Sequence, residues 1–168
     1  MSHATYTDEE RLLKIDKVFY ISFLVFVILG VISYYVNFLT FFISSIIVGI
    51  GLLIIREYNL LKSLKYLKKD RVYKIKPKMS LQKKESIITQ LTTFLLIILP
   101  LLALYLAPIP INLSIALGIV GGWPLSNLFI QFLLLLLENN LNGKIYSIII
   151  WEEIDNEYYI KEYGYIVK

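Results

Sequence analysis

Two long stretches of this 168-residue chain contain no charged side chain, residues 18–55 and residues 86–137. A helix that crosses a bilayer needs about 20 consecutive, mainly apolar residues. Stretches of 38 and 52 residues therefore each accommodate two crossings rather than one. A helix of this length in a soluble protein would turn a charged face toward water. The two stretches predict four transmembrane helices, arranged as two antiparallel hairpins.

Each charge-free stretch contains a short sequence that indicates where its hairpin turns. In the first stretch, Tyr34 and Tyr35 suit the boundary between membrane and water, where tyrosine is enriched. In the second, Pro108 and Pro110 indicate a turn, because the residue before a proline is driven out of the helical conformation. We therefore expect helices over residues 18–35, 38–55, 86–106 and 111–137.

The charges beside these stretches predict the orientation of the chain. Residues 56–85 hold eleven of the 17 Lys and Arg residues and carry a net charge of +8, eleven basic against three acidic. Basic loops are retained in the cytoplasm. We expect a multi-pass protein of the cell membrane with both termini cytoplasmic. Its parts are a cytoplasmic N-terminal segment (1–17), transmembrane hairpin 1 (18–55), a basic cytoplasmic loop (56–85), transmembrane hairpin 2 (86–137) and an acidic cytoplasmic tail (138–168).

The segments outside the spans have their own local patterns. Thr7 and Glu10 fit a capping box, which predicts a short helix starting near Asp8. Residues 144–151 and 158–167 are rich in Ile, Tyr and Val and are separated by a polar turn, which makes the tail a candidate β-hairpin. The expected fold class is an all-α integral membrane protein with this hairpin as its cytoplasmic tail.

The basic loop continues the second helix with an apolar side and a lysine side. Leu60, Leu64 and Leu67 recur at helical spacing, while lysines occupy the positions between them. The simplest interpretation is that the basic side contacts anionic lipid headgroups or an acidic partner. Interleaved tyrosines are also typical of nucleic-acid sites, an alternative that we consider weaker. The expected contact residues are Lys62, Lys65, Lys68, Lys69 and Arg71.

Small residues recur at every fourth position of the fourth expected helix: Ser114, Gly118, Gly122 and Ser126. Four residues advance about 400° around a helix, so the four lie on one side. Small residues at this spacing let another helix approach closely in a membrane. The stripe predicts a helix interface, made either with a partner chain or within the same four-helix bundle.

The second hairpin also contains features of a polar site in the middle of the membrane. Pro100 and Pro124 interrupt the hydrogen bonding of their helices, and interrupted helices form substrate sites in transporters. Asn127 and Gln131 lie one turn apart and can line such a site. The alternative is that the prolines only bend the helices and the amides bond neighbouring helices.

No cofactor, metal site or catalytic residue is predicted. Asp16, Glu57, Glu85 and Glu138 fall at the four expected helix ends, where we interpret them as charges marking the ends of spans rather than as metal ligands. No phosphate-binding loop, His-rich signature or paired nucleophile and base is present. The chain has no cysteine, which excludes disulfides and thiolate sites, and with its high Ile and Lys content this favours a thermophilic prokaryotic source.

These observations lead to one main functional hypothesis and two alternatives. The main hypothesis is a non-enzymatic structural, accessory or assembly subunit of a membrane complex, with membrane lipid, other membrane subunits or further copies of itself as partners. The first alternative is a small homo-oligomeric channel or carrier for a neutral solute. The weakest is a membrane enzyme acting on lipid through Glu57, Glu85 or Glu138. The arrangement of helices and loops does not by itself distinguish these functions.

Overall fold

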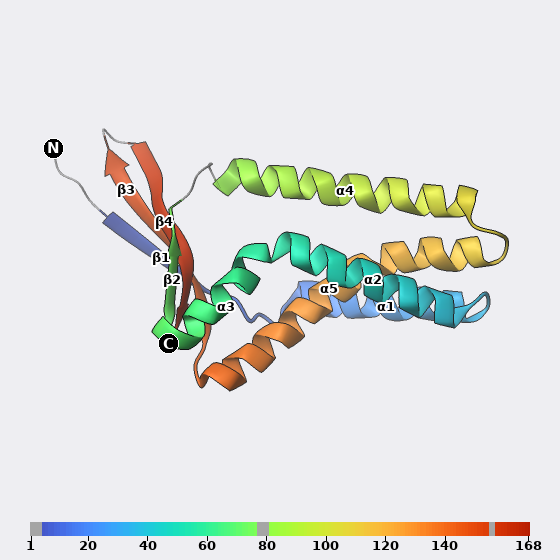
Figure 1. The fold of residues 1–168 in the computed structure, drawn as a ribbon, viewed down its shortest axis with the longest axis horizontal. Coiled ribbons are helices and arrows are strands. Elements are labelled where there is room, and N and C mark those ends of the chain that lie inside the picture. The colour runs from blue at the N-terminus through green and yellow to red at the C-terminus, as the bar shows by residue number, and fades with distance from the viewer. Residues whose placement is uncertain (1–4, 77–80, 155–156) are drawn as a thin grey trace. The chain divides into compact units, whose positions relative to one another are not determined.

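The computed structural model describes residues 5–76, 81–154 and 157–168, and it contains five helices and four strands in those ranges. Figure 1 shows them in chain order. They are β1 (Thr5–Arg11), α1 (Lys17–Tyr34), α2 (Phe38–Arg56), α3 (Tyr58–Asp70), β2 (Val72–Ile75), α4 (Leu81–Leu106), α5 (Ile111–Leu141), β3 (Ile145–Ile154) and β4 (Glu157–Val167).

The chain forms two compact units. The first, here called the helical unit, consists of Ile15–Tyr58 and Ile87–Leu133. The second, here called the sheet unit, consists of the described parts of Met1–Lys14, Asn59–Ser86 and Leu134–Lys168. The sheet unit is thus assembled from three separate stretches of chain, which precede, divide and follow the apolar helices.

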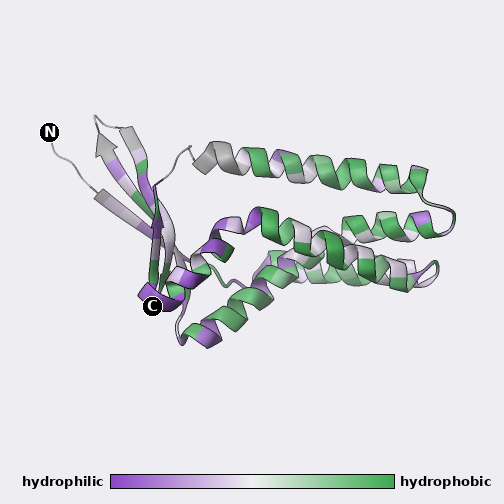
Figure 2. Ribbon diagram, viewed as in Figure 1, coloured by the Kyte–Doolittle hydropathy of each residue, from purple (hydrophilic) through white to green (hydrophobic). Residues whose placement is uncertain are grey.

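The helical unit confirms the expectation of four long apolar helices. Four helices are long and apolar enough to cross a membrane, and they cover Lys17–Tyr34, Phe38–Arg56, Ser86–Leu106 and Ile111–Leu141. Figure 2 shows hydrophobic residues along these helices and hydrophilic residues concentrated in the strands and α3. The expected boundaries are close to those observed, except that α4 starts earlier and α5 continues to Leu141, into the segment expected to belong to the tail.

Local side-chain hydrogen bonds explain where the first two helices begin. Asp16 is the N-cap of α1, and its carboxylate accepts from the backbone N–H groups of Val18 at 3.0 Å and Phe19 at 3.2 Å. Asn37 caps α2 in the same way, with Oδ1 accepting from the N–H of Thr40 at 3.1 Å. Each cap satisfies N–H groups that the helix itself leaves without a partner.

The sheet unit contains one antiparallel four-stranded sheet in the order β1-β3-β4-β2. The expected hairpin in the tail is confirmed as β3 and β4, and it forms the centre of this sheet. The expected short helix near Asp8 is wrong, because this segment is strand β1, in which Asp8 pairs with Ile149 of β3. Strand β2 was not expected from the sequence either. An isolated hairpin is marginal in water, and these two edge strands give it partners on both sides.

Helix α3 contacts strands β2 and β4 through Tyr66 and Asn59. Leu60 and Leu67 are almost completely buried, at 1% and 0% exposure, as the leucine spacing predicts. Tyr66 of α3 stacks on Tyr73 of β2 with ring centroids 5.0 Å apart. The apolar side of α3 is thus buried, whereas its lysines are exposed.

An ion pair links β1 to the end of α5. The guanidinium of Arg11 donates from Nη2 to Glu138 Oε2 at 2.7 Å and from Nε to Oε1 at 3.4 Å. Glu138 Oε1 also accepts from the backbone N–H of Ile145, the first residue of β3, at 2.9 Å. Burial raises the pKa of Glu138, but the hydrogen bonds and charge of Arg11 and the N–H of Ile145 outweigh burial, so this pKa is lowered. One carboxylate therefore connects three elements of the sheet unit.

Replacing Glu138 with glutamine is expected to destabilise the sheet unit at neutral pH. A lowered pKa means that the folded state prefers the charged carboxylate, so the stabilisation is present above the unfolded-state pKa and is lost as the pH falls below about 4. The guanidinium is partly exposed and screened by solvent, which limits the loss to about 1 kcal/mol at pH 7. The loss should shrink toward zero at pH 3.

The measurement is a urea titration at pH 7, 5 and 3, followed by the fluorescence of Trp151 in a Trp123→Phe background. Glu10→Gln is the matched control, because among the described residues the ion pair of Glu10 is the exposed one with Lys14. A pH-independent difference between the parent and Glu138→Gln, or equal midpoints for both variants, would show that the ion pair with Arg11 does not stabilise the sheet.

Candidate functional site

The stripe of small residues on α5 packs against α2. Ser114 and Ser126 are buried, at 0% and 2% exposure. A Cβ atom added to Gly118 would lie 2.8 Å from the carbonyl oxygen of Phe41, and one added to Gly122 would lie 2.5 Å from Cγ1 of Val48. Of the two interfaces considered from the sequence, the structure places these residues in a contact within the chain. This face of α5 is covered by α2.

A polar cluster joins three helices beside this contact. Arg56, the last residue of α2, donates from Nη1 to Asn127 Oδ1 at 2.6 Å and to Ser126 Oγ at 3.3 Å, both on α5. Asn127 in turn donates from Nδ2 to Ser22 Oγ of α1 at 3.0 Å. Ser22 and Asn127 are buried, at 1% and 7% exposure. Polar side chains thus connect α1, α2 and α5 at the end of the α2 span.

The electrostatics of this cluster are unusual, because its members other than Arg56 are neutral. None of the ion pairs among the described residues includes Arg56. The carboxyl of Glu57, just beyond the span, does not pair with it, and burial raises the pKa of that carboxyl against the opposing effect of the Arg56 charge. Among the described residues, the guanidinium therefore has no acidic partner for its positive charge at the end of an apolar helix.

The residues proposed as a site in the middle of the membrane do not come together as a set. Asn127 belongs to the cluster with Arg56, whereas Gln131 lies one turn further along α5 and is half-buried. Pro100 and Pro124 both lie inside helices that continue past them, so each helix carries on although its proline supplies no N–H for the helical hydrogen bond. Pro124 is buried, and α5 bends along its length in Figure 1. Pro124 is the natural cause of this bend, because its ring clashes with the preceding turn.

Arg56 also lines a cavity of about 420 Å³ between α2, α4 and α5 in the helical unit. Thr92 of α4 has a buried hydroxyl with no hydrogen-bond partner among the described residues. The indole of Trp123 lines the cavity from α5. The remaining lining residues all come from α4 and are Ile88, Thr89, Thr93, Leu96 and Ile97. The cavity therefore combines one cation, three hydroxyl groups and apolar side chains.

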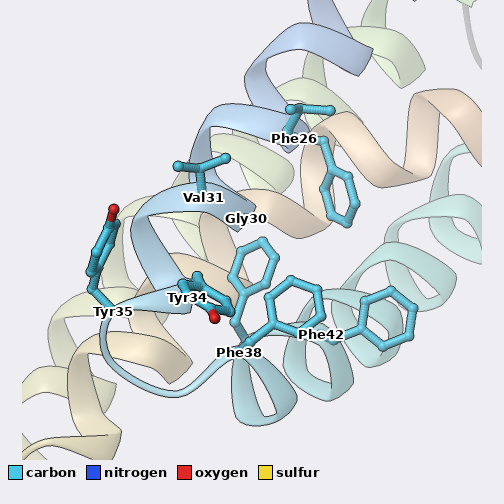
Figure 3. A pocket seen from close by; sticks show the side chains of 9 residues that line it. Phe26, Gly30, Val31, Tyr34, Tyr35, Phe38 and Phe42 are labelled. Atoms are coloured by element: carbon cyan, nitrogen blue, oxygen red, sulfur yellow. The ribbon is translucent and has the colours of Figure 1, made fainter.

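A second cavity, of about 540 Å³, is a groove between α1 and α2 next to their connecting turn. Figure 3 shows Phe38 and Phe42 of α2 beside Tyr34 of α1, and the Phe38 and Phe42 rings stack with centroids 6.1 Å apart. The lining is aromatic and aliphatic apart from the two tyrosine hydroxyls. It is formed by Phe26, Val27, Gly30, Val31, Tyr34, Tyr35, Phe38, Phe41 and Phe42. Such a lining suits lipid chains but supplies no group for chemistry.

The basic residues expected to meet lipid or a partner lie on and just after α3. All five are exposed: Lys62, Lys65, Lys68, Lys69 and Arg71. Arg71 follows the end of α3 and has a positive φ of 55°, a conformation that commonly ends helices. This exposed basic row is separate from the cluster at Arg56, which belongs to the helical unit.

The carboxylates at the helix ends have different surroundings. Asp16 caps α1 and Glu138 pairs with Arg11, while the Glu85 side chain lies outside the described residues. Within the described ranges, no group of three or more His, Asp or Glu side chains is arranged to hold a metal ion.

Sequence reasoning missed the most polar part of the helical unit. It assigned Arg56 to the basic loop and did not single out Ser22 or the threonines of α4. The available signals were an arginine directly at the end of a charge-free helix and three threonines, Thr89, Thr92 and Thr93, spaced along one side of α4. Comparison with protein families, with curated proteins and with solved structures found no match for this chain.

Proposed function

We propose that this chain is a non-enzymatic, multi-pass protein of the cell membrane that serves as a structural, accessory or assembly subunit of a larger membrane complex. The observation that carries the proposal is that the sheet unit is assembled from three separate segments of the chain. Its strands come from the segment before α1, the segment between α2 and α4, and the segment after α5. Together they form a folded unit with a free basic helix surface, which suits contact with a partner.

The same observation supports the proposed topology. Strands can pair in one sheet only if they lie on the same side of a membrane. The pairing of β1 with β3 and of β2 with β4 therefore requires an even number of crossings between these segments. Two hairpins, α1 with α2 and α4 with α5, meet this requirement. The net charge of +8 on residues 56–85 favours the cytoplasm as the shared side.

The exposed basic row on α3 is the proposed surface for anionic headgroups and for a partner. Each Lys or Arg near an anionic leaflet contributes about 1 kcal/mol of attraction. The apolar side of α3 is already buried, so the charged side is the part of this helix that remains available. Loss of several of these charges should weaken assembly without unfolding the sheet.

A single introduced cysteine tests both the orientation and the role as a subunit, because the chain contains no other cysteine. Lys69→Cys should resist a membrane-impermeant thiol reagent added to intact cells and react after the cells are opened. Asn112→Cys, next to the α4–α5 turn, is the matched control and should react in intact cells. Labelling of Lys69→Cys from outside would overturn the proposed orientation.

The same Lys69→Cys variant can then carry a photo-crosslinker in native membranes. We expect one protein to be captured at a fixed stoichiometry, and a tag on that protein should recover this chain in return. Crosslinks only between copies of this chain would instead support the alternative of a homo-oligomeric channel or carrier. A chain that stays monomeric and uncrosslinked would contradict the subunit role.

A further inference from the structure

We infer that the cavity beside Arg56 is a binding site for a phosphate oxyanion carried by an anionic phospholipid. This site lies within the helical unit and is distinct from the basic row on α3. It does not depend on the proposed role as a subunit, since any membrane protein with this cavity would present the same chemistry to lipid.

The first support is the state of Arg56. Its Nη1 donates to Ser126 and Asn127, and Asn127 donates to Ser22, so these hydrogen bonds orient the guanidinium although Arg56 as a residue is exposed. No acceptor among the described residues bonds its Nε or Nη2. A guanidinium presents its donors in a planar fork that matches two phosphate oxygens. The cluster therefore orients a cation and leaves the rest of its fork free.

The second support is the hydroxyl of Thr92. A buried hydroxyl without a partner costs free energy, and native proteins seldom retain one without a reason. Thr92 Oγ1 has no partner among the described residues and lies in the wall that Arg56 shares. Thr89 and Thr93 add two further hydroxyls to the same wall. Hydroxyl groups beside a guanidinium are donors that a phosphate can accept from.

The third support is the order of side chains along α4. Ile88 and then the three threonines line the part of α4 near the end of the span at Ser86, and Leu96 and Ile97 follow deeper in the helix. This change from polar to apolar follows the change from headgroup to acyl chain in a lipid. The volume of about 420 Å³ falls within the range of small-molecule sites, roughly 300–1,000 Å³. It is larger than a phosphate alone requires, which leaves room for glycerol and the first part of a chain.

The test uses the full chain with Trp151→Phe, so that Trp123 in the cavity wall is the sole indole. The protein is placed in phosphatidylcholine nanodiscs and titrated with phosphatidylglycerol that carries brominated acyl chains. We expect saturable quenching of Trp123 and a rise in melting temperature. Arg56→Gln should weaken this binding about tenfold or more, because it removes a charge-assisted contact.

Thr92→Val separates binding from folding. Its hydroxyl bonds none of the described residues, so the variant should melt at the same or a higher temperature than the parent. Its affinity for phosphatidylglycerol should nevertheless fall severalfold. Lys17→Gln is the control for surface charge, because Lys17 is an exposed cation at the start of α1, outside the cavity. Its affinity should stay within about twofold of the parent value.

Titration with glycerol 3-phosphate and inorganic phosphate identifies the source of the oxyanion. Weak binding of both, with tight binding of phosphatidylglycerol, supports a lipid ligand. Equal binding of the soluble phosphates, still lost in Arg56→Gln, would keep the oxyanion site but assign it to a free phosphate. The inference is overturned if quenching is not saturable, if Lys17→Gln loses as much affinity as Arg56→Gln, or if Thr92→Val binds like the parent.

Discussion

Replacing Gly118 with leucine is expected to separate helices α2 and α5 and to lower the free energy of unfolding of the helical unit by about 3 kcal/mol or more. A Cβ at Gly118 would lie 1.8 Å from Ser44 Oγ and 2.8 Å from the Phe41 carbonyl oxygen. The serine hydroxyl can rotate away, but the carbonyl belongs to the main chain and cannot. In lipid, the association of helices depends on close packing. A side chain that holds α2 and α5 apart therefore removes most of the favourable free energy of their association.

Gly122→Leu should act in the same way, since a Cβ there would lie 2.7 Å from Cβ of Val48 and 3.1 Å from the backbone nitrogen of Gly49. Gly51→Leu is the matched control. Gly51 lies on α2, and a Cβ added to it meets no atom within 4 Å. The same substitution there should leave stability unchanged or slightly improved, because glycine is a poor helix former.

The measurement is survival of the folded monomer after a graded thermal challenge in detergent, read by size-exclusion chromatography. Leu133→Ala is a second comparison further along α5, beyond the last residue of the small-residue stripe, and it should cost less. If Gly118→Leu and Gly122→Leu both survive like the parent while Leu133→Ala fails, the essential contact of α5 is not the one made by its glycines.

Replacing Gly164 with alanine is expected to detach strand β2 from the sheet, at a cost of about 2–4 kcal/mol. Gly164 of β4 pairs with Lys74 of β2. A Cβ at Gly164 would lie 1.8 Å from the carbonyl oxygen of Tyr73, 2.8 Å from its carbonyl carbon and 2.9 Å from Cα of Lys74. All three atoms are main chain, so no rotamer change relieves the clash. Because β2 has four residues and lies at the edge of the sheet, it is the strand that should be displaced.

Amide hydrogen exchange over residues 72–75 measures this effect directly. Detachment of β2 should make these amides exchange rapidly, while the amides that pair β1 with β3 stay protected. Gly51→Ala provides the same chemical change at an open position and should leave exchange in β2 as in the parent. Slow exchange of residues 72–75 in Gly164→Ala would mean that β4 accommodates a side chain by shifting.

The helices were predictable because their signal is local. A run of residues without charge needs no knowledge of distant contacts to be identified as long and apolar, and the observed helices agree with it closely. The central hairpin of the tail was also local, since its two strands are adjacent in sequence and joined by a polar turn. The stripe on α5 was visible as a spacing, but the spacing did not say which helix would cover it.

The edge strands could not be predicted in the same way. Thr7 and Glu10 satisfy a local rule for a helix start, yet the segment pairs with β3, more than 130 residues later in the chain. Strand pairing is a contact between distant segments, and it outweighs a weak local preference for a helix. Strand β2, with four residues in a lysine-rich loop, had no recognisable pattern of its own.

The positions of the charges along the chain were enough to predict four helices suited to a bilayer, with the charged residues in the segments outside them. Both features are local, because burying a charge in lipid is costly wherever the chain places it. The sharing of one sheet by three of those segments became visible only in the fold. The tertiary structure also decided that Arg56 turns back toward Asn127 and Thr92, because the direction of a long side chain at a helix end depends on which neighbours offer it a partner.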